Sequence, residues 1–173
     1  MYIKDEEKYK IIVIGDDGVG KTTLIKGFDV TGFKTDYQPT IGVNIFSREV
    51  EIMKRHVPLS FWEMNRDAKW DFFRSSFFRN VNGVLIIFDL TNHETFVSLN
   101  DLIKEVHNYV DAIPILIIGN KKDLEEMRQV EKKEISGLIK SVSCEYLETS
   151  AKTGENINIA FEKILTMLFP KQA

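Results

Sequence analysis

The chain has 173 residues, of which 43% are hydrophobic, so it is long enough for one well-buried core and too short for two comfortable domains; we expect one domain over residues 1–173. The formal charge of −3 and the isoelectric point near 5.7 exclude a global basic field, and with it sequence-independent nucleic-acid binding. Cys144 is the only cysteine, which excludes an internal disulfide and suits a reducing compartment.

Short apolar runs bounded by glycine, proline or polar residues mark the expected strands. In chain order these runs are residues 11–14, 43–52, 59–62, 84–88, 115–118 and 145–147. The run at 43–52 is mixed with polar residues, so we expect a half-exposed strand that turns at 53–56 and pairs antiparallel with the next. Apolar residues at helical spacing predict helices at 95–109, 131–141 and near the end of the chain. Strands that alternate with helices indicate an α/β fold with a mostly parallel sheet.

The first strand leads directly into a glycine-rich segment that fits G-x-x-x-x-G-K-[ST]. The residues expected to hold phosphate are Asp17, Gly18, Val19, Gly20, Lys21, Thr22 and Thr23. Glycines let several backbone N–H groups approach phosphate oxygens. Lys21 adds a charge between the β- and γ-phosphates, and the Thr22 hydroxyl is placed to bind Mg²⁺. The strand before and the helix after the loop are the context that this motif requires, which disfavours a chance match.

Two further motifs follow buried strands at the edge of the sheet where ligands of such folds bind. They are Asn120-Lys121-Lys122-Asp123 and Ser150-Ala151-Lys152. Together with the phosphate loop they resemble the N-K-x-D and S-A-K motifs of the Ras-like small GTPases. An ionised carboxylate at Asp123 accepts from both donors on one edge of guanine, whereas adenine offers no matching pair.

The resemblance implies a GTP- or GDP-binding protein with the three-layer P-loop NTPase fold and a six-stranded, mostly parallel sheet. It implies that Asn120 braces neighbouring loops and that the Lys121 stem covers one face of the base. The Ala151 N–H is expected to donate to the guanine carbonyl oxygen, with Ser150 and Lys152 beside it.

Within these GTPases the sequence is most similar to the Rab proteins, from about residue 9 to residue 169. Residues 40–46, 75–83 and 88–91 resemble Rab signatures, the last two being similar to S-S-Y-Y-R-G-A-H-G and Y-D-V-T. The resemblance implies that Phe33 stacks on guanine, although an ordinary buried phenylalanine would have the same pattern. It also implies that Thr40 in switch I binds Mg²⁺ through its hydroxyl and the γ-phosphate through its N–H.

Rab proteins present an aromatic triad to effectors and exchange factors, and the matching positions are Ile45, Trp62 and Phe77. Ile45 lacks the ring, so effector choice is expected to differ. Packing between the switches is the other explanation of these apolar residues, and it remains open. We expect a monomer that contacts protein partners through this surface and the switch regions.

The main departure from the family lies in switch II, where W-D-T-A-G-Q-E is replaced by Trp62-Glu63-Met64-Asn65-Arg66-Asp67-Ala68. Glu63 keeps the charge that holds a Mg²⁺-bound water but is longer by one methylene, and Mg²⁺ demands tight octahedral geometry. Arg66 replaces a glycine where the backbone approaches the γ-phosphate. Asp67 replaces the water-positioning glutamine and can only accept hydrogen bonds. Asp17 adds a further acid in the phosphate loop.

These replacements predict a Rab-like guanine nucleotide-binding switch in vesicle trafficking whose GTP hydrolysis is very slow or absent, with GTP or GDP and Mg²⁺ as ligands. Two alternatives stay open. One is an active GTPase in which Arg66, as an internal arginine finger, or Asp67 has a substitute catalytic role. The other is a nucleotide-free interaction module that retains only the fold.

The location expected from sequence is cytoplasmic, with the cytosolic face of endomembranes as the site of action. The first seven residues include charged side chains and no secretory pattern, and no apolar run approaches a bilayer span. Residues 169–173 contain no cysteine that could be prenylated, so membrane contact is expected to be indirect or to require a tail beyond this sequence.

Overall fold

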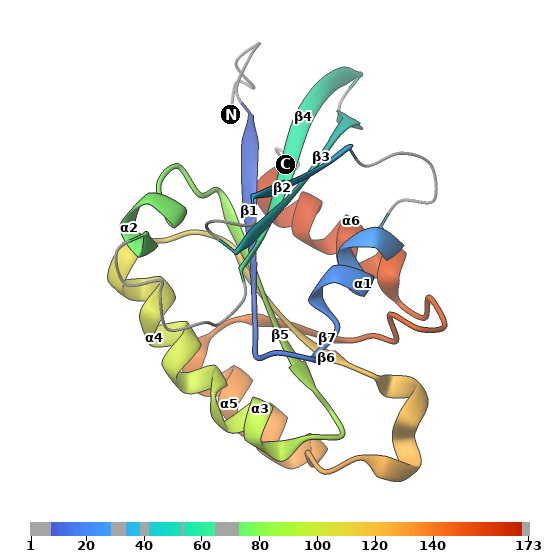
Figure 1. Cartoon of the computed structure of the whole chain (residues 1–173). Helices are drawn as coiled ribbons and strands as arrows, with labels where there is room; N and C mark the ends of the chain where they lie inside the picture. Colours follow the sequence, from blue (N-terminus) through green and yellow to red (C-terminus); the bar gives the residue numbers. More distant parts are fainter. Residues whose placement is uncertain (1–7, 29–33, 39–41, 53, 65–72, 171–173) are drawn as a thin grey trace.

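The computed structural model describes residues 8–28, 34–38, 42–52, 54–64 and 73–170, and within these ranges seven strands form one sheet (Figure 1). The strands are β1 (Tyr9–Ile14), β2 (Lys34–Gln38), β3 (Val43–Ile52), β4 (Arg55–Met64), β5 (Gly83–Asp89), β6 (Ile115–Asn120) and β7 (Glu145–Glu148). Their order is β2-β3-β4-β1-β5-β6-β7. The neighbouring pairs β4–β1, β1–β5, β5–β6 and β6–β7 are parallel, whereas β3 is antiparallel to both β2 and β4.

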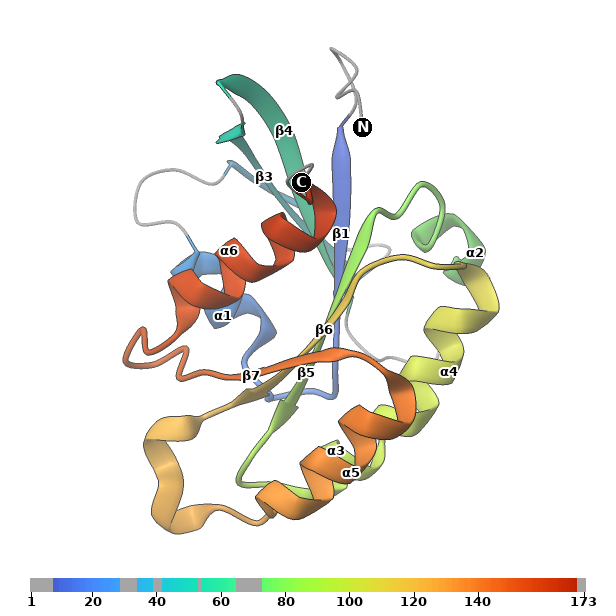
Figure 2. The same ribbon diagram turned by 180° about the vertical axis from the view of Figure 1, so that it is seen from behind.

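Helices lie on both faces of this sheet, as the two views in Figures 1 and 2 show. They are α1 (Lys21–Gly27), α2 (Arg74–Phe77), α3 (His93–Val97), α4 (Leu99–Tyr109), α5 (Lys132–Val142) and α6 (Ile157–Leu168), with a kinked 3₁₀ segment at Lys122–Met127. Apolar residues of α1 and α6 pack in one core cluster and those of α2, α4 and α5 in the other. The fold therefore has three layers.

The central strands explain why the apolar runs are continuous. In β1, Ile11 and Val13 belong to the core under α1 and α6, while Ile12 and Ile14 belong to the opposite core. All four are at most 2% exposed. Successive side chains of a strand point to opposite faces, so a strand covered on both sides needs apolar residues at every position. Each such side chain contributes about 1.5 to 3 kcal/mol through burial.

The predicted α/β fold is confirmed, and each of the six predicted strands is present. The antiparallel hairpin is also confirmed, but the turn predicted at 53–56 is shorter, because Arg55 and His56 already belong to β4 and lie opposite Ile52 and Glu51. The prediction of six strands was short by one, because β2 was missed. Its sequence, Lys-Thr-Asp-Tyr-Gln, has no apolar run, and its backbone pairs with β3 at the edge of the sheet, from Lys34 opposite Ser47 to Gln38 opposite Val43.

The single helix predicted over 95–109 is two helices, α3 and α4, which meet at Ser98. The Ser98 hydroxyl donates to Asp16 Oδ2 at 2.6 Å, so this junction is tied to the phosphate loop. The helix predicted at 131–141 begins one residue later, because Glu131 caps it: its side chain and that of Glu134 form a reciprocal capping box.

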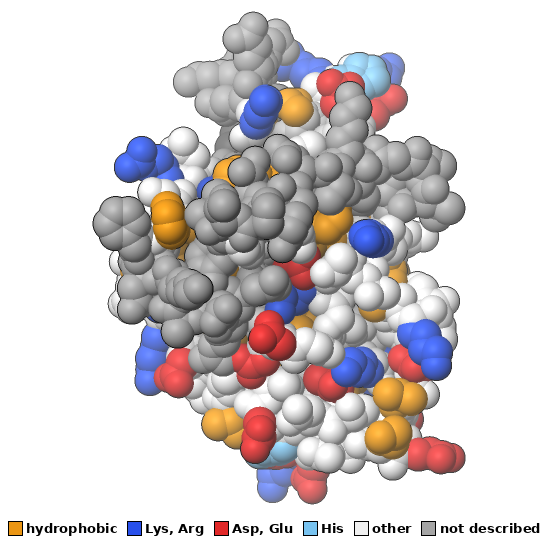
Figure 3. Space-filling view, viewed as in Figure 1, with side chains coloured by type: hydrophobic (Ala, Val, Ile, Leu, Met, Phe, Trp, Pro, Cys, Tyr) orange, Lys and Arg blue, Asp and Glu red, His pale blue; other side chains and the backbone are white. Residues whose placement is uncertain are grey.

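Charged side chains of both signs are interspersed over the coloured part of the face in Figure 3. This agrees with the net charge of −3 and with the absence of a global basic field expected from composition. Among the helices in the described ranges, none is long and apolar enough to cross a membrane.

Candidate functional site

The phosphate loop joins β1 to α1, and at two of its glycines, Gly15 and Gly20, there is no room for a larger residue. A Cβ at Gly15 would lie 2.3 Å from the Ile87 carbonyl oxygen, and one at Gly20, where φ is 99°, would lie 2.4 Å from Asn120 Nδ2. Glycine is needed at both positions, since a methyl group would push against the backbone of β5 or against the asparagine of the first base motif. Within the predicted loop of residues 15–22, the conformation at these two positions therefore requires the glycines of the motif.

Lys21 is the buried cation of this loop. It is 5% exposed, and its Nζ donates to the carbonyl oxygens of Gly15 and Asp16, each at 2.9 Å. Burial lowers the pKa of Lys21 from its ordinary value, and the charges of Glu63, Asp17 and Asp16 oppose that shift. Two neutral carbonyl groups therefore hold this ammonium at the loop, where a phosphate oxygen would bind.

Thr22 in the first turn of α1 is joined directly to Glu63 at the end of β4. Its hydroxyl donates to Glu63 Oε1 at 2.6 Å. Glu63 is 3% exposed, and its other oxygen accepts from Asn44 Nδ2 at 2.9 Å. Two of the residues predicted to hold Mg²⁺ are thus in contact, and Asn44 is a third member of the group that sequence reasoning missed.

Asn120 connects the phosphate loop to the two base motifs. It is 2% exposed, and its Nδ2 donates to the Val19 carbonyl oxygen at 2.8 Å. Its Oδ1 accepts from Thr149 Oγ1 at 3.1 Å and from the Ala151 N–H at 3.0 Å. The Ala151 N–H was expected to face guanine; in this structure it donates to Asn120.

A cavity of about 210 Å³ lies where these loops meet. Its lining consists of Gly20, Thr23, Asn120, Lys121, Asp123, Leu124, Ala151 and Lys152. Asp123 Oδ1 accepts from the buried Ser150 hydroxyl at 2.6 Å, which orients the carboxylate that would select guanine. The structure brings together the predicted base-reading residues in the described ranges, and it adds Leu124 as an apolar wall.

Asp89 is a further residue of this site that sequence reasoning did not assign. Its Oδ2 pairs with Lys121 Nζ at 2.6 Å, and its Oδ1 accepts from the backbone and hydroxyl of Thr91. Asp89 lies opposite Asn120 in the register of β5 and β6. The sequence did contain a signal for Asp89: it is a carboxylate at the end of the strand that neighbours the strand leading to Asn120.

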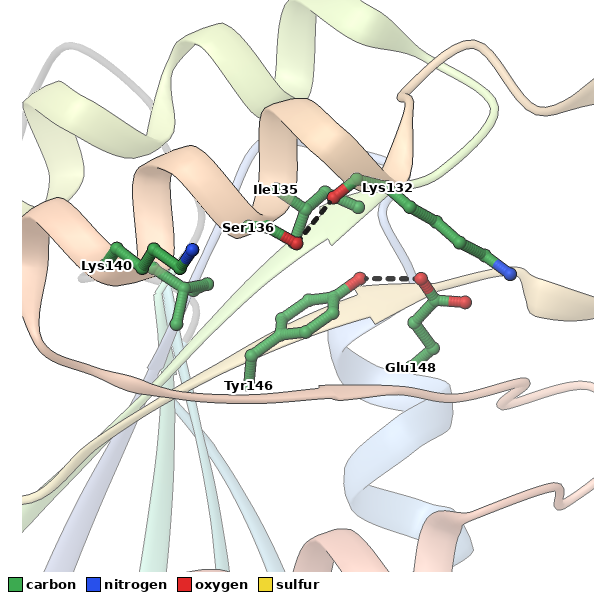
Figure 4. A pocket seen from close by; sticks show the side chains of 7 residues that line it. Lys132, Ile135, Ser136, Lys140, Tyr146 and Glu148 are labelled. Carbon is green, nitrogen blue, oxygen red and sulfur yellow. Dashed lines mark hydrogen bonds between the residues drawn. The ribbon is translucent and has the colours of Figure 1, made fainter.

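Behind the base motifs, the edge strand β7 is held by a small polar cluster beside a cavity of about 280 Å³ against α5. Figure 4 shows the Tyr146 hydroxyl pointing to Glu148, to which it donates at 3.0 Å. Glu148 also pairs with Arg128 at 2.6 Å. Burial raises the pKa of Tyr146, so its phenol stays neutral. A Cβ at Gly119 would lie 2.6 Å from the Tyr146 oxygen, so this ring packs directly against the strand that ends in Asn120.

The predicted partner surface is brought together, but its members differ in exposure. Ile45 lies opposite Trp62 in the register of β3 and β4, and the rings of Trp62 and Phe77 are 6.5 Å apart. Ile45 and Trp62 are partly exposed. Phe77 is 3% exposed and belongs to the core cluster against which both of them pack. The buried ammonium of Lys10 lies 3.9 Å from the centre of the Trp62 ring and donates to the Phe77 carbonyl oxygen.

Four predicted site residues, Phe33, Thr40, Arg66 and Asp67, lie outside the described residues. Their roles stay predictions. The rest of the predicted site belongs to the ends of β1, β4, β6 and β7, at one edge of the sheet.

A parallel sheet whose first strand leads into this loop, together with an asparagine-braced base pocket, defines a P-loop nucleotide-binding protein. The sequence model of the Ras family matches residues 10–169, and the chain belongs to this family. It is a Rab-type small GTPase, because relatives that are more than 30% identical over most of the chain carry Rab names.

Ras-related protein RABC2b of Arabidopsis thaliana is 36% identical over 160 residues, covering 90% of this chain and 77% of that protein. Human Ras-related protein Rab-25 is 33% identical over 164 residues, covering 94% of this chain and 77% of that protein.

Replacing Asn120 by alanine tests the brace. We expect Asn120→Ala to lower the free energy of unfolding by about 2 to 4 kcal/mol, because it leaves buried donors and an acceptor without partners. Urea unfolding followed by circular dichroism measures the change. Asn108→Ala, at an exposed position of α4, is the control. Equal stability of the two variants would show that the hydrogen bonds of Asn120 do not contribute to the free energy of unfolding.

Lys10 predicts a pH dependence of stability. Burial lowers the pKa of Lys10 from 10.5 to about 8, so between these values the unfolded state binds the proton that the folded state has lost. The free energy of unfolding therefore rises with pH across this window. We expect wild type to gain about 1 to 3 kcal/mol relative to Lys10→Met over the same window, measured by urea unfolding. Parallel pH profiles of the two proteins would contradict the prediction.

Proposed function

We propose that this Rab-type GTPase binds GTP and GDP and acts as a switch in vesicle trafficking, with GTP hydrolysis that is very slow or absent. The observation that carries the binding half is the base cavity, in which Asp123 is oriented by Ser150 and Asn120 joins the base loops to the phosphate loop. A carboxylate held in this way matches the two donors on one edge of guanine.

The residues present fit a magnesium ion. Within the described ranges no group of three or more His, Cys, Asp or Glu side chains could hold a metal, so the protein offers no dedicated cage. Mg²⁺ commonly binds through one or two carboxylates together with phosphates and waters. Because the Thr22 hydroxyl donates to Glu63, its lone pairs stay available to a cation. When bound, Mg²⁺ would offset the negative charge of the phosphates, with Thr22 and Thr40 as its protein contacts and Glu63 acting through a metal-bound water.

Three replacements support slow hydrolysis. Asp67 cannot donate to a transferring phosphoryl group, as the family's glutamine does, and it brings further negative charge. Arg66 places a side chain where the family has none. Asp17 is exposed in the phosphate loop and adds a further acid there. The effect is expected on hydrolysis more than on binding, because Lys21, Thr22 and the base motifs match the family patterns.

Identification of the bound nucleotide and single-turnover hydrolysis test the proposal. We expect guanine nucleotide to co-purify with the chain and loaded GTP to persist. Restoring the family residues in Arg66→Gly/Asp67→Gln should raise the hydrolysis rate by about 10-fold to 100-fold. Rapid phosphate release by wild type that Arg66→Ala abolishes would instead support an active enzyme. A pocket that holds no nucleotide would support the interaction module.

Asp123→Asn tests the choice of base. An amide can accept from one purine N–H and donate to a carbonyl oxygen, so xanthine becomes the better match. We expect GDP affinity to fall by at least about 100-fold and xanthosine diphosphate affinity to rise. Competition against a fluorescent nucleotide measures both, with Asp111→Asn as an exposed control. A variant that still prefers GDP would refute the assignment of Asp123.

A further inference from the structure

Glu63 lies in the middle of the sheet, between the strand that leads to the phosphate loop and the strand that carries Asn44. In the registers of the sheet it lies opposite Val13 of β1 and opposite Asn44 of β3. Its carboxylate is almost completely buried, and each oxygen accepts one hydrogen bond, from Thr22 Oγ1 at 2.6 Å and from Asn44 Nδ2 at 2.9 Å. The three polar groups therefore form one chain from β3 to α1.

We propose that Asn44 is a positioning residue for the magnesium site: its amide fixes the Glu63 carboxylate, which in turn orients the Thr22 hydroxyl. This inference rests on the proposed nucleotide-binding function. It assigns Asn44 a role that acts through Glu63, without contact to the metal or the nucleotide.

The length of the glutamate side chain is the reason that such a residue is needed. Glutamate has one more rotatable bond than aspartate, and holding it in one conformation costs side-chain entropy. A donor on the second carboxylate oxygen restricts that freedom and partly satisfies a buried charge. Without the amide, Glu63 could rotate away from Thr22, and the hydroxyl would lose the acceptor that directs its proton away from a bound cation.

The strand register also places Asn44 next to the edge strand β2. Its backbone lies opposite Tyr37 of β2 on one side and opposite Glu63 of β4 on the other. A displacement of β3 along β4 would break the amide contact with Glu63. The position of the edge strands and the grip on the metal are therefore coupled through a single hydrogen bond of 2.9 Å.

The experiment measures how Mg²⁺ slows the dissociation of a fluorescent GDP analogue. Dissociation rates are recorded over a series of free Mg²⁺ concentrations and in EDTA, for wild type and Asn44→Ala. We expect Asn44→Ala to raise the Mg²⁺ concentration of half-maximal effect by about 10-fold, as for other residues that support a metal ligand. In EDTA the two proteins should release the nucleotide at similar rates, because Asn44 does not touch the base or phosphate residues by any described hydrogen bond.

Two variants separate positioning from general stability. Ser47→Ala changes an exposed residue of the same strand and should leave the Mg²⁺ dependence unchanged. In a Glu63→Asp background, where the carboxylate is drawn back by one methylene from the geometry that joins both partners, Asn44→Ala should have a smaller effect than in wild type.

Asn44→Ala with the Mg²⁺ dependence of wild type would overturn the inference while GDP binding, and with it the proposed function, stands; a lowered melting temperature alone would not rescue it. An equal effect of Asn44→Ala in the Glu63→Asp background would also overturn it, since the amide would then act without Glu63. Wild type that binds no guanine nucleotide would remove both the proposed function and the inference.

Discussion

The site depends on one buried side chain, Asn120, which links three segments that are distant in sequence. Its amide holds the phosphate loop at Val19, and its carbonyl oxygen holds Thr149 and Ala151 after β7. The two parts of a nucleotide, phosphate and base, are read by different loops, so their separation must be fixed before either can select its ligand. Three hydrogen bonds to one asparagine provide that fixed separation, and Gly20 allows the close approach.

Buried charges in the site are each matched by a specific partner. The buried Asp89 carboxylate pairs with Lys121, and the buried Glu63 carboxylate receives donors from both sides. An unpaired charge at such depth would be costly, so these partners restrict where each functional side chain can point. The same pairs that satisfy burial therefore also orient the groups that a nucleotide would meet.

Sequence reasoning predicted the elements whose patterns are local. The phosphate loop follows a fully apolar strand, and the base motifs follow others, so their shared edge could be predicted from the α/β topology alone. β2 could not be predicted, because Lys34–Gln38 has no apolar run and its pairing with β3 is a tertiary contact. Asn44 and Asp89 were missed for a related reason: each acts on a residue far away in sequence, and only the strand register brings the partners together.

In the proposed function, binding and hydrolysis are assigned to different parts of this chain, so one could be altered without the other. The binding residues Lys21, Asn120 and Ser150 are buried, and their hydrogen bonds also hold loops of the fold together. A substitution there would weaken the structure as well as the site. The altered residues Arg66 and Asp67 follow β4 in sequence and lie outside the described residues. Glu63 belongs to both groups, since it is buried like the first and differs from the family like the second. It keeps the acidic character of the family residue and accepts a hydrogen bond from Asn44. The buried glutamate at this border of the core is therefore supported by a donor from the neighbouring strand.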